Sequence, residues 1–492
     1  MRHRSPTNHA GPTSVAGQPR QDIEEILHPR SIAVVGASTN PDKQGYIYVR
    51  MLKEFGFKGA IYPVNPKAKE IAGLKCYPSL KEVPRPLDYV ISAVPAALVP
   101  QLVDDALGLD VRAIHLFTGR LAEAGTDEAV RRQQKLVEVA RKGGIRIIGP
   151  NCMGIYHPCV GISFRLNFPK RSGPVGIVSQ SGNNAFEFVY RASQRGVFFS
   201  KVISYGNASD LDESDFLEYL AHDPETSIIA TYIEGIKDGG RFFKTLKTAA
   251  SAKPVILLKG GRTGAGTRAA ASHTASLAGV EEVWDAAVKQ AGALWVDSLE
   301  EMADMVVAFL YMRVPHGRRT AVICGGGGGS VFSADVCEAN GLQVPPLPDD
   351  IRDQLKAHLP ETWFMVSNPI DVSAVDGEGL MSTAARLMAQ HSAFDLMIVD
   401  PDLEWHFERP ENQERIKKLM DRLIEVKRSF DGPMAMVIRP SDSSEHWRWQ
   451  TTVEVQTKAW EAGIPVFPSM ARAAHAADRL MRYNARVRTK SS

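Results

Sequence analysis

Short apolar runs alternate with longer amphipathic stretches along most of this 492-residue chain. Such alternation is typical of α/β domains, in which buried parallel strands are joined by helices. The runs fall into three series. The first series comprises Ser31–Val35, Ala60–Val64, Asp88–Val94, Ala113–Phe117 and Arg146–Ile148, the second Val175–Ser179, Lys201–Tyr205, Ile228–Ile233 and Pro254–Lys259, and the third Ala321–Cys324, Phe394–Val399, Met434–Arg439 and Pro465–Phe467. The pattern therefore predicts three doubly wound parallel-sheet domains in tandem.

Composition suggests where these domains begin and end. Residues 1–21 are polar, with Pro, Gly, His and Arg but no apolar stretch, so we expect a disordered tail and no signal peptide. The Pro/Arg/Ser/Gly break at Pro169–Pro174 precedes the second series of strands. Apolar residues at helical spacing in Glu281–Ala291 and Glu300–Tyr311 indicate helices between the second and third series. We divide the chain into domains at 22–150, 151–295 and 319–474, with a helical linker at 296–318 and a basic helix or tail at 475–492.

Bulk composition narrows the functional classes. Apolar content of 44% and charged content of 23% are those of an ordinary globular protein, and a net charge of +2 gives no reason to expect nucleic acid or membrane partners. The most apolar stretch, Tyr89–Val103, is interrupted by prolines and is too short to span a bilayer. Five cysteines without CxxC spacing predict a reducing, cytoplasmic location with no disulfide and no metal site.

Ligands of parallel sheets bind at the carboxyl ends of strands, where helix N-termini present N–H groups. The first such motif runs from Val34 to Gly45 and contains Gly36, Ser38 and Lys43. It is not GxGxxG, and no acidic residue ends the second strand near Asn65, which weakens a dinucleotide interpretation. Lysines at this strand end suit a phosphorylated nucleotide, but a plain strand-to-helix turn is an alternative.

Two further strand ends carry polar or glycine-rich motifs. Ser179, Gln180, Ser181 and Gly182 precede a predicted helix and can form an oxyanion or phosphate seat, although ordinary helix capping is an alternative. Five glycines at Gly325–Gly329 follow the first strand of the third series. They expose backbone N–H groups for a ligand, or they form a flexible loop. The chain has no Walker A motif.

His273 lies in a run of small residues between Gly260 and Gly279. Neutral imidazole is nucleophilic near pH 7, and a glycine-rich loop can carry it between two places. The alternative is an incidental surface histidine. Glu234 ends a strand of the second series, where it can accept a hydrogen bond from one nitrogen of His273 or cap the following turn.

Taken together, these motifs match one family. The chain resembles the α-subunit of NDP-forming acyl-CoA synthetases, the ADP-forming acetate–CoA ligase group related to succinyl-CoA synthetase. The resemblance implies a Rossmann-like CoA-binding domain followed by two flavodoxin-like ligase domains. The matching stretches are Ser31–Ser38, Ile61–Gly73, Gly149–Gly154, Pro174–Gly182, Asp223–Gly235, Lys259–Gly279 and Ser367–Asp371.

The resemblance also assigns roles to individual residues. His273 would become phosphorylated, Glu234 would be its carboxylate partner, and Ser179–Gly182 would seat the phosphate. CoA would contact the first domain, and Asn151 would approach its thioester end. The residues implied as CoA contacts are Gly36, Ser38, Lys43, Asn65, Pro66, Val94 and Pro95.

The implied reaction is acid + CoA + ATP ⇌ acyl-CoA + ADP + phosphate, through an acyl phosphate and phospho-His273. In this family an ATP-grasp module binds ADP or ATP with Mg²⁺, and nothing after Ser469 is long enough to be one. We therefore expect a separate ATP-grasp β-subunit, a small carboxylic acid or acyl-CoA as substrate, and a hetero- or homo-oligomer.

The chain departs from the family pattern at Phe117–Leu121, at Asn183–Asn184 and at Ala275–Ser276. The first two departures lie near the expected CoA and acyl region, so they put the acyl specificity in doubt. A second hypothesis is a non-catalytic CoA or acyl-CoA binding or sensing protein of the same architecture. A Rossmann dehydrogenase, which NADH titration would reveal, is a third.

Overall fold

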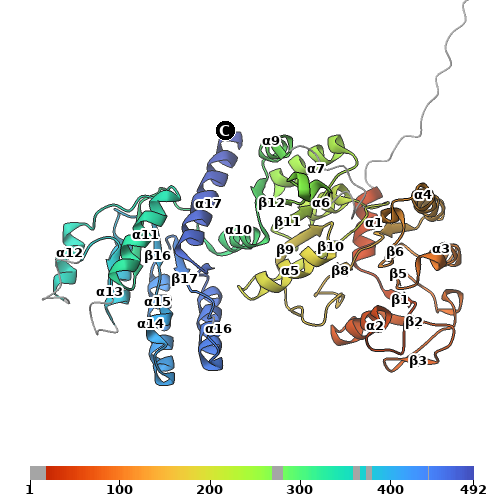
Figure 1. Ribbon diagram of the computed structural model, residues 1–492, viewed down its shortest axis with the longest axis horizontal. Helices are drawn as coiled ribbons and strands as arrows, with labels where there is room; N and C mark the ends of the chain where they lie inside the picture. The colour runs from red at the N-terminus through yellow and green to blue at the C-terminus, as the bar shows by residue number, and fades with distance from the viewer. Residues whose placement is uncertain (1–17, 269–280, 358–365, 373–378, 442, 492) are drawn as a thin grey trace, which may run out of the picture. The chain divides into compact units, whose positions relative to one another are not determined.

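The computed structural model describes residues 18–268, 281–357, 366–372, 379–441 and 443–491 (Figure 1). Contacts within the chain divide it into two compact units. One unit contains the chain up to Phe164 together with Ile203–Asp223, and the other contains Arg165–Val202 together with the chain from Pro224 onward. Each unit is described separately below. The domain boundaries drawn from the sequence stay a prediction.

The first unit is built on a five-stranded parallel sheet with the order β2-β1-β5-β6-β7. Its strands are β1 (Ser31–Val35), β2 (Ala60–Val64), β5 (Tyr89–Ser92), β6 (Ala113–Leu116) and β7 (Arg146–Ile148). A small antiparallel pair and a further short strand are β3 (Glu70–Ile71), β4 (Leu74–Lys75) and β8 (Gly154–Tyr156). Its helices are α1 (Gln18–Leu27), α2 (Gln44–Glu54), η1 (Leu80–Glu82), η2 (Ala96–Leu98), α3 (Val99–Ala106), η3 (Ala122–Ala124), α4 (Asp127–Lys142) and α6 (Glu213–His222).

The second unit contains two further sheets. One has the order β13-β12-β11-β9-β10, and the other has the order β15-β14-β16-β17-β18. The strands are β9 (Ser172–Ser179), β10 (Phe199–Ser204), β11 (Ile228–Ile233), β12 (Val255–Lys259), β13 (Leu294–Val296), β14 (Thr320–Cys324), β15 (Ile370–Asp371), β16 (Leu396–Val399), β17 (Met434–Val437) and β18 (Val466–Phe467). The helices are α5 (Gly182–Ser193), α7 (Gly239–Ala252), α9 (Glu281–Ala291), α10 (Leu299–Tyr311), α11 (Gly327–Ala339), α12 (Asp349–Lys356), α13 (Leu380–Gln390), α14 (Leu403–His406), η5 (Pro410–Asn412), α15 (Gln413–Ser429), α16 (His446–Glu461) and α17 (Met470–Ser491).

All three sheets repeat one topology. When the five parallel strands of each sheet are counted in chain order, their spatial order is 2-1-3-4-5. This is the order of flavodoxin-like sheets, and also that of a six-stranded Rossmann sheet without its third strand. The strand order reverses between the first and third strands, so each sheet has a switch point there, where ligands of such sheets bind. The prediction of tandem doubly wound α/β sheets is confirmed.

Local sequence explains where several helices begin. Thr126 accepts a hydrogen bond from the N–H of Ala129 and starts α4, which has acidic residues in its first turn and basic ones in its last. Asp212 and Asp215 form a reciprocal capping box that starts α6. Helix α10, which the sequence suggested as part of a linker, packs on β11, β12 and α17 within the second unit.

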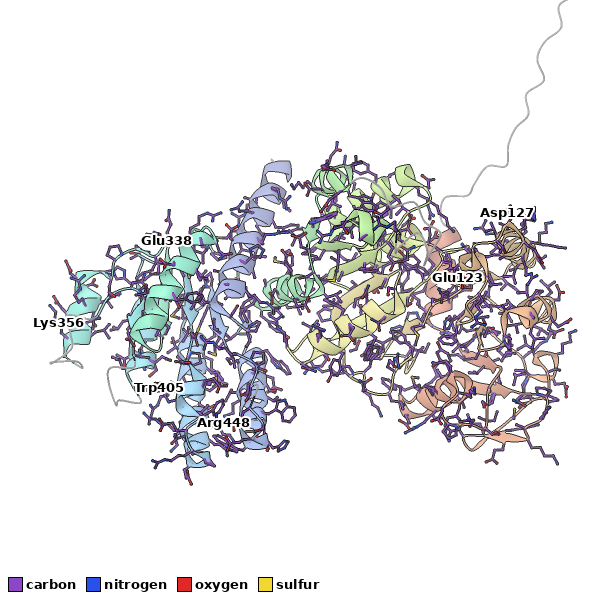
Figure 2. The ribbon with its side chains drawn as sticks, viewed as in Figure 1. Glu123, Asp127, Glu338, Lys356, Trp405 and Arg448 are labelled. Carbon is purple, nitrogen blue, oxygen red and sulfur yellow. The ribbon has the colours of Figure 1, made fainter. Side chains whose placement is uncertain are left out.

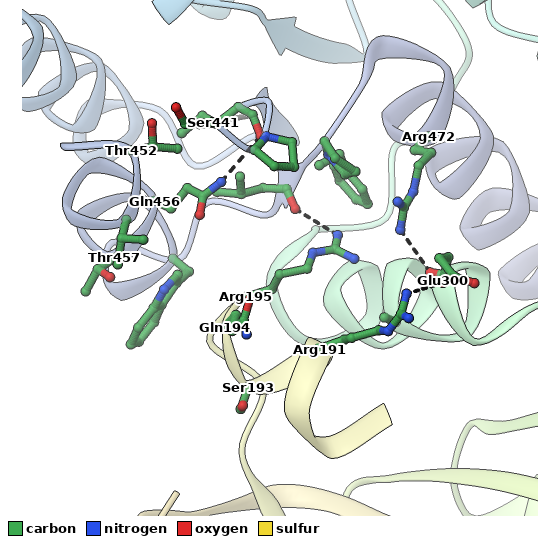
Figure 3. A pocket seen from close by; sticks show the side chains of 18 of the residues that line it. Arg191, Ser193, Gln194, Arg195, Glu300, Ser441, Thr452, Gln456, Thr457 and Arg472 are labelled. Atoms are coloured by element: carbon green, nitrogen blue, oxygen red, sulfur yellow. Dashed lines mark hydrogen bonds and ion pairs between the residues drawn. The ribbon is translucent and has the colours of Figure 1, made fainter. Parts of the chain in front are cut away.

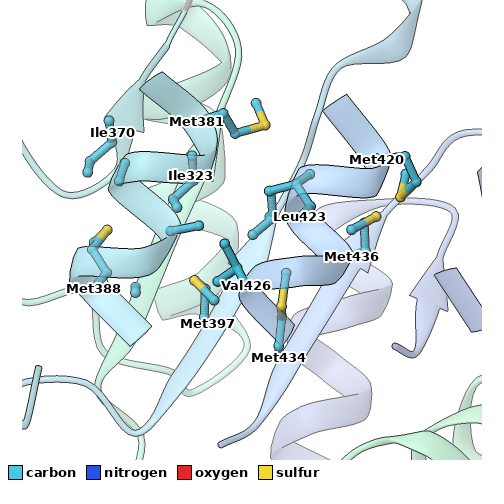
Figure 4. Packing of buried hydrophobic residues seen from close by; sticks show 14 of the residues in the cluster. Ile323, Ile370, Met381, Met388, Met397, Met420, Leu423, Val426, Met434 and Met436 are labelled. Atoms are coloured by element: carbon cyan, nitrogen blue, oxygen red, sulfur yellow. The ribbon is translucent and has the colours of Figure 1, made fainter. Parts of the chain in front are cut away.

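The sheets are covered by apolar side chains from the surrounding helices. In the third sheet, methionines of α13, α15, β16 and β17 fill much of the core, together with Leu423 and Ile323 (Figure 4). Methionine is unbranched and adapts to irregular gaps between helix and sheet. Among the described residues, no helix is long and apolar enough to cross a membrane.

Candidate active site

The second sheet brings two of the sequence-predicted groups together at its switch point. Strands β9 and β11 are neighbours, and the residues that follow each of them meet at the carboxyl edge of the sheet. The side-chain oxygen of Gln180 accepts hydrogen bonds from the N–H of Glu234 (2.7 Å) and of Gly235 (3.0 Å). The turn after β9 and the turn after β11 are therefore fastened to each other.

The serine hydroxyls of the predicted phosphate seat make hydrogen bonds within the turn between β9 and α5. Ser181 is the N-cap of α5 and accepts a hydrogen bond from the N–H of Asn184 (3.2 Å). The Ser179 hydroxyl donates to the backbone oxygen of Ser181 (2.7 Å). Helix capping and an anion seat are thus compatible here, because the serines shape the turn while the first N–H groups of α5 remain the natural donors to an anion.

The Glu234 side chain is largely closed to solvent. The residue is 8% exposed, and its Oε1 accepts a hydrogen bond from the Tyr232 hydroxyl (3.2 Å). Burial, with a smaller contribution from the Glu234 charge, raises the pKa of Tyr232 above its ordinary value, so this hydroxyl stays a donor. Tyr232 was not among the residues predicted from the sequence, although its place near the end of β11 was a usable signal.

His273 lies outside the described residues, as do Ala275 and Ser276. What the structure describes is the start of the segment that carries it. Lys259 ends β12 and pairs with Ile233 of β11, so the chain leaves the sheet next to Glu234. Gly260 follows at once, and its N–H donates to the oxygen of Ile233 (2.8 Å).

The switch point of the first sheet lies between β1 and β5, where Gly36 and Val94 follow their strands. Gly36 has φ +83°, and a Cβ there would lie 2.8 Å from the carbonyl carbon and oxygen of Ala93 and 3.0 Å from Val94 Cγ1. Only glycine fits this close approach of two backbones. The predicted CoA contacts Ser38 and Pro95 lie on the same two turns.

Asn65 and Lys43 occupy different positions at this edge. The Asn65 amide donates to the oxygen of Ala37 (2.7 Å), and its Oδ1 accepts from the N–H of Lys67 (2.9 Å), so this side chain holds two loops in place. Pro66 follows it in the same turn. Lys43 is exposed at the N-terminus of α2, where its ammonium can reach a phosphate.

Asn151 lies in a turn that the structure ties to the end of β6. It adopts φ +57°, and its N–H donates to the oxygen of Thr118 (3.0 Å). A Cβ at Gly119 would lie 3.2 Å from the Asn151 side-chain oxygen. The segment Phe117–Leu121, which departs from the family pattern, thus lies directly against Asn151.

Glu123, on η3, completes this corner of the first unit (Figure 2). Its two carboxylate oxygens accept from the N–H of Arg120 (2.5 Å) and from the amide of Asn207 (2.6 Å). The sequence analysis missed Thr118, Glu123 and Asn207. Each follows the end of a strand, so the rule that identified the other sites could have found them.

At the switch point of the third sheet, the glycine run forms the first turn of α11 and not a free loop. The N–H of Gly326 donates to Asp371 Oδ1 (2.9 Å). At the same edge of the sheet, Arg439, which follows β17, pairs with Asp400 (2.7 Å) and with Asp402 (3.3 Å), which follow β16. Burial raises the pKa of Asp400, and the Arg439 charge opposes this shift. The helix start at Gly326–Gly329 replaces the flexible loop considered from the sequence, and a ligand at its N–H groups stays a prediction.

A separate cavity of about 640 Å³ lies between α5, α10 and α16 (Figure 3). None of the described site residues predicted from sequence lines it. Its arginines are engaged by acidic partners: Arg195 and Arg472 share Asp304 at 2.7 and 2.5 Å, and Arg191 contacts Glu300 at 2.5 Å. The cavity is therefore no part of the candidate active site, which lies at the switch points.

Comparison with known proteins agrees with this arrangement. A family model described as CoA binding domain matches residues 30–158, and one described as succinyl-CoA ligase like flavodoxin domain matches residues 172–309. The fold and these matches define a CoA-ligase subunit.

Individual relatives identify the family more closely. The chain is 40% identical over 377 residues to the α-subunit of acetate–CoA ligase [ADP-forming] II of Pyrococcus furiosus, a match that covers 76% of this chain and 81% of the relative. It is 35% identical over 379 residues to acetate–CoA ligase [ADP-forming] I of Archaeoglobus fulgidus, covering 76% of this chain and 54% of that longer protein.

A solved structure matches over nearly the whole length. The dinucleotide forming acetyl-coenzyme A synthetase 1 of Ca. Korarchaeum cryptofilum, in complex with phosphate and ADP, superposes with a TM-score of 0.79 at 30% identity, covering 95% of this chain and 98% of that one. The chain belongs to the family of ADP-forming acetate–CoA ligase α-subunits.

Proposed function

We propose that this chain is the CoA-binding, phosphohistidine-carrying subunit of an ADP-forming acyl-CoA synthetase. With a separate ATP-grasp subunit it interconverts acid + CoA + ATP with acyl-CoA + ADP + phosphate. The observation that carries the proposal is the fastening of the Gln180 turn to the Glu234 turn at the second switch point. An anion-receiving helix start and a buried carboxylate then lie beside the strand end that leads to His273.

The proposed reaction has two chemical steps on this chain, formation of an acyl phosphate and transfer of its phosphoryl group to His273. An oxygen of orthophosphate attacks the thioester carbonyl, the C–S bond breaks, and the CoA thiol leaves with a proton. A nitrogen of His273 then attacks phosphorus of the acyl phosphate, the P–O bond to the acyl group breaks, and the carboxylate leaves. Phosphoryl transfer depends mainly on positioning and charge stabilisation. Backbone N–H groups at the start of α5 stabilise the phosphate, while Glu234 orients the imidazole and raises its basicity.

The first switch point is the proposed CoA site. Gly36 lets the turn after β1 pack directly against Ala93 and Val94 at this sheet edge, which is where ligands of such sheets bind. Lys43 supplies positive charge for the CoA phosphates. Asn151, held by Thr118, borders the thioester end. Mg²⁺ and the nucleotide belong to the ATP-grasp partner, because phospho-His273 delivers its phosphoryl group to ADP there.

The test uses the purified full chain and [³²P]acetyl phosphate, which supplies the acyl phosphate without a partner. We expect an acid-labile, base-stable label on His273, and CoA binding by calorimetry. An undiminished label in His273→Ala overturns the phosphohistidine assignment. CoA binding without any label favours the non-catalytic binding protein, and a fluorescence change with NADH favours a dehydrogenase.

A further inference from the structure

A buried lysine joins the two strand ends of the candidate phosphohistidine site. Lys259 is the last residue of β12 and is 3% exposed. Its ammonium donates to the backbone oxygen of Glu234 (2.6 Å) and to that of Gly260. The same ammonium lies 5.2 Å from the centre of the Trp284 ring. A charge that is this well enclosed must be offset by its surroundings, because burial of an isolated ammonium is costly.

The contacts place this charge between the two elements on which the proposed chemistry depends. One acceptor, the Glu234 carbonyl, belongs to the turn that Gln180 also holds. The other, the Gly260 carbonyl, belongs to the first residue after β12, where the segment toward His273 begins. A Cβ at Gly260 would lie 2.3 Å from the Tyr232 hydroxyl and 3.3 Å from Glu234 Cγ, so the chain leaves the sheet in close contact with this pair.

We propose that Lys259 is a positioning residue of the phosphohistidine site: it fixes the Glu234 turn to the base of the His273 segment and offsets negative charge there. This inference rests on the proposed function. A phosphoryl group that reaches His273 adds negative charge close to the Glu234 carboxylate, and a neighbouring ammonium reduces the repulsion. Oriented charges inside a closed site act strongly on phosphoryl transfer.

The electrostatic surroundings give the proposal a distinctive pH signature. Burial lowers the pKa of Lys259 below its ordinary value of 10.5; the Glu234 charge raises it, and the nearby Arg262 lowers it further. Arg262 itself is engaged by Asp297. Lys259 should therefore lose its charge at a lower pH than an exposed lysine does, and the site should lose its offsetting charge in the same interval.

The experiment follows the labelling rate of the full chain by [³²P]acetyl phosphate between pH 6 and pH 10. Lys259→Met keeps the length but removes the charge, and we expect it to label about tenfold to a hundredfold more slowly. In Lys259→Arg the charge cannot be removed, so the alkaline fall in rate that we expect for the wild type should be absent. Lys201→Met is the matched control, because Lys201 is fully buried in β10 and pairs with Glu225 at 2.5 Å.

The outcomes separate the two proposals. A wild-type chain that takes no label at His273 overturns the proposed function itself. A wild type that labels normally, with Lys259→Met labelling at the same rate, overturns the role of Lys259. If Lys259→Met fails to fold, as judged by circular dichroism, the pH profiles of the wild type and Lys259→Arg decide. If the labelling rates of the wild type and Lys259→Arg fall over the same alkaline pH range, the proposal is overturned. It is also overturned if Lys201→Met labels as slowly as Lys259→Met does.

Discussion

The side-chain oxygen of Gln180 bonds to the N–H of Glu234 at 2.7 Å, across 54 residues of sequence. Gln180 follows β9 and Glu234 follows β11, and these strands are neighbours only because the sheet order reverses at this point. One amide thus closes the switch point of the second sheet. It places a helix start, whose first N–H groups can receive an anion, beside a buried carboxylate, and the proposed phosphoryl transfer uses both.

Two substitutions of Gln180 should separate its contribution to stability from the effect of charge at the phosphate seat. Gln180→Leu leaves the N–H groups of Glu234 and Gly235 without their acceptor, so we expect a loss of about 2 kcal/mol in the free energy of unfolding. Gln180→Glu retains acceptor oxygens but adds negative charge at the phosphate seat. It should keep near-wild-type stability and lose most of the labelling by [³²P]acetyl phosphate. Urea titration measures the stability of both variants, and labelling rates measure the effect on the phosphate seat. Equal labelling rates in Gln180→Glu and the wild type would contradict a phosphate seat at this turn.

Gly36→Ala should damage the first switch point. The substitution adds a Cβ at φ +83° and 2.8 Å from the Ala93 carbonyl, so the turn must move. We expect CoA affinity, measured by calorimetry, to fall at least about tenfold, which corresponds to roughly 1.4 kcal/mol.

Gly56→Ala is the control for that experiment. Gly56 has a similar φ of +75°, but a Cβ there meets nothing within 4 Å. It should lower stability by the backbone strain alone, about 1–2 kcal/mol, and leave CoA binding unchanged. If both alanine variants bind CoA equally well, the crevice at Gly36 is not the CoA site.

The sequence predicted most strands of the three sheets. The bounds of β1, β2, β7 and β11 agree with the predicted runs, and the helices α9 and α10 were located to within one residue. The short strands β8, β13 and β15 were missed. These three strands bury only a few side chains each, so the sequence shows no clear periodic pattern there and pairing with neighbouring strands largely defines them.

The candidate site was predictable in its parts but not in its connections. Strand-end motifs singled out Gly36, the Ser179–Gly182 turn and Glu234, because ligands of parallel sheets bind at strand ends. The sequence could not show that Gln180 reaches Glu234, since strand order is a long-range property. The contacts of Asn65 could not be predicted from the sequence either. We expected Asn65 to contact CoA, whereas in the structure its side-chain amide donates to the oxygen of Ala37 and its side-chain oxygen accepts from the N–H of Lys67. A CoA contact by Asn65 stays a prediction.

A buried histidine should make the first unit sensitive to mild acid. His115 is 1% exposed, its Nε2 lies 3.1 Å from the oxygen of Cys152, and burial lowers its pKa from 6.5 to about 4. Between these two values the unfolded chain binds the extra proton and the folded chain does not. The stabilisation is therefore complete above pH 6.5 and is lost as pH falls toward 4.

The comparison variant is His115→Gln, which keeps a donor and an acceptor but cannot titrate. Between pH 7 and pH 4 the wild type should lose about 3 kcal/mol more of its free energy of unfolding than this variant does. Urea unfolding at several pH values measures the difference. Parallel losses in the two proteins would show that His115 does not titrate on unfolding in this interval.

Asp304 should be the most sensitive acidic residue around the cavity of the second unit. Its side chain is 7% exposed and pairs with Arg195 (2.7 Å) from the end of α5 and with Arg472 (2.5 Å) from α17. Asp304→Asn removes the charge that both guanidiniums share; because the Arg195 and Arg472 side chains are 17% and 33% exposed, we expect a loss of about 3 kcal/mol, at the low end of the range for a buried pair. Glu300→Gln is the matched control, because Glu300 and its partner Arg191 are both about half exposed, and such pairs contribute about 0–1 kcal/mol. Urea unfolding of the two variants should therefore differ by several kcal/mol; similar midpoints would mean that Asp304 does not hold α5 and α17 together.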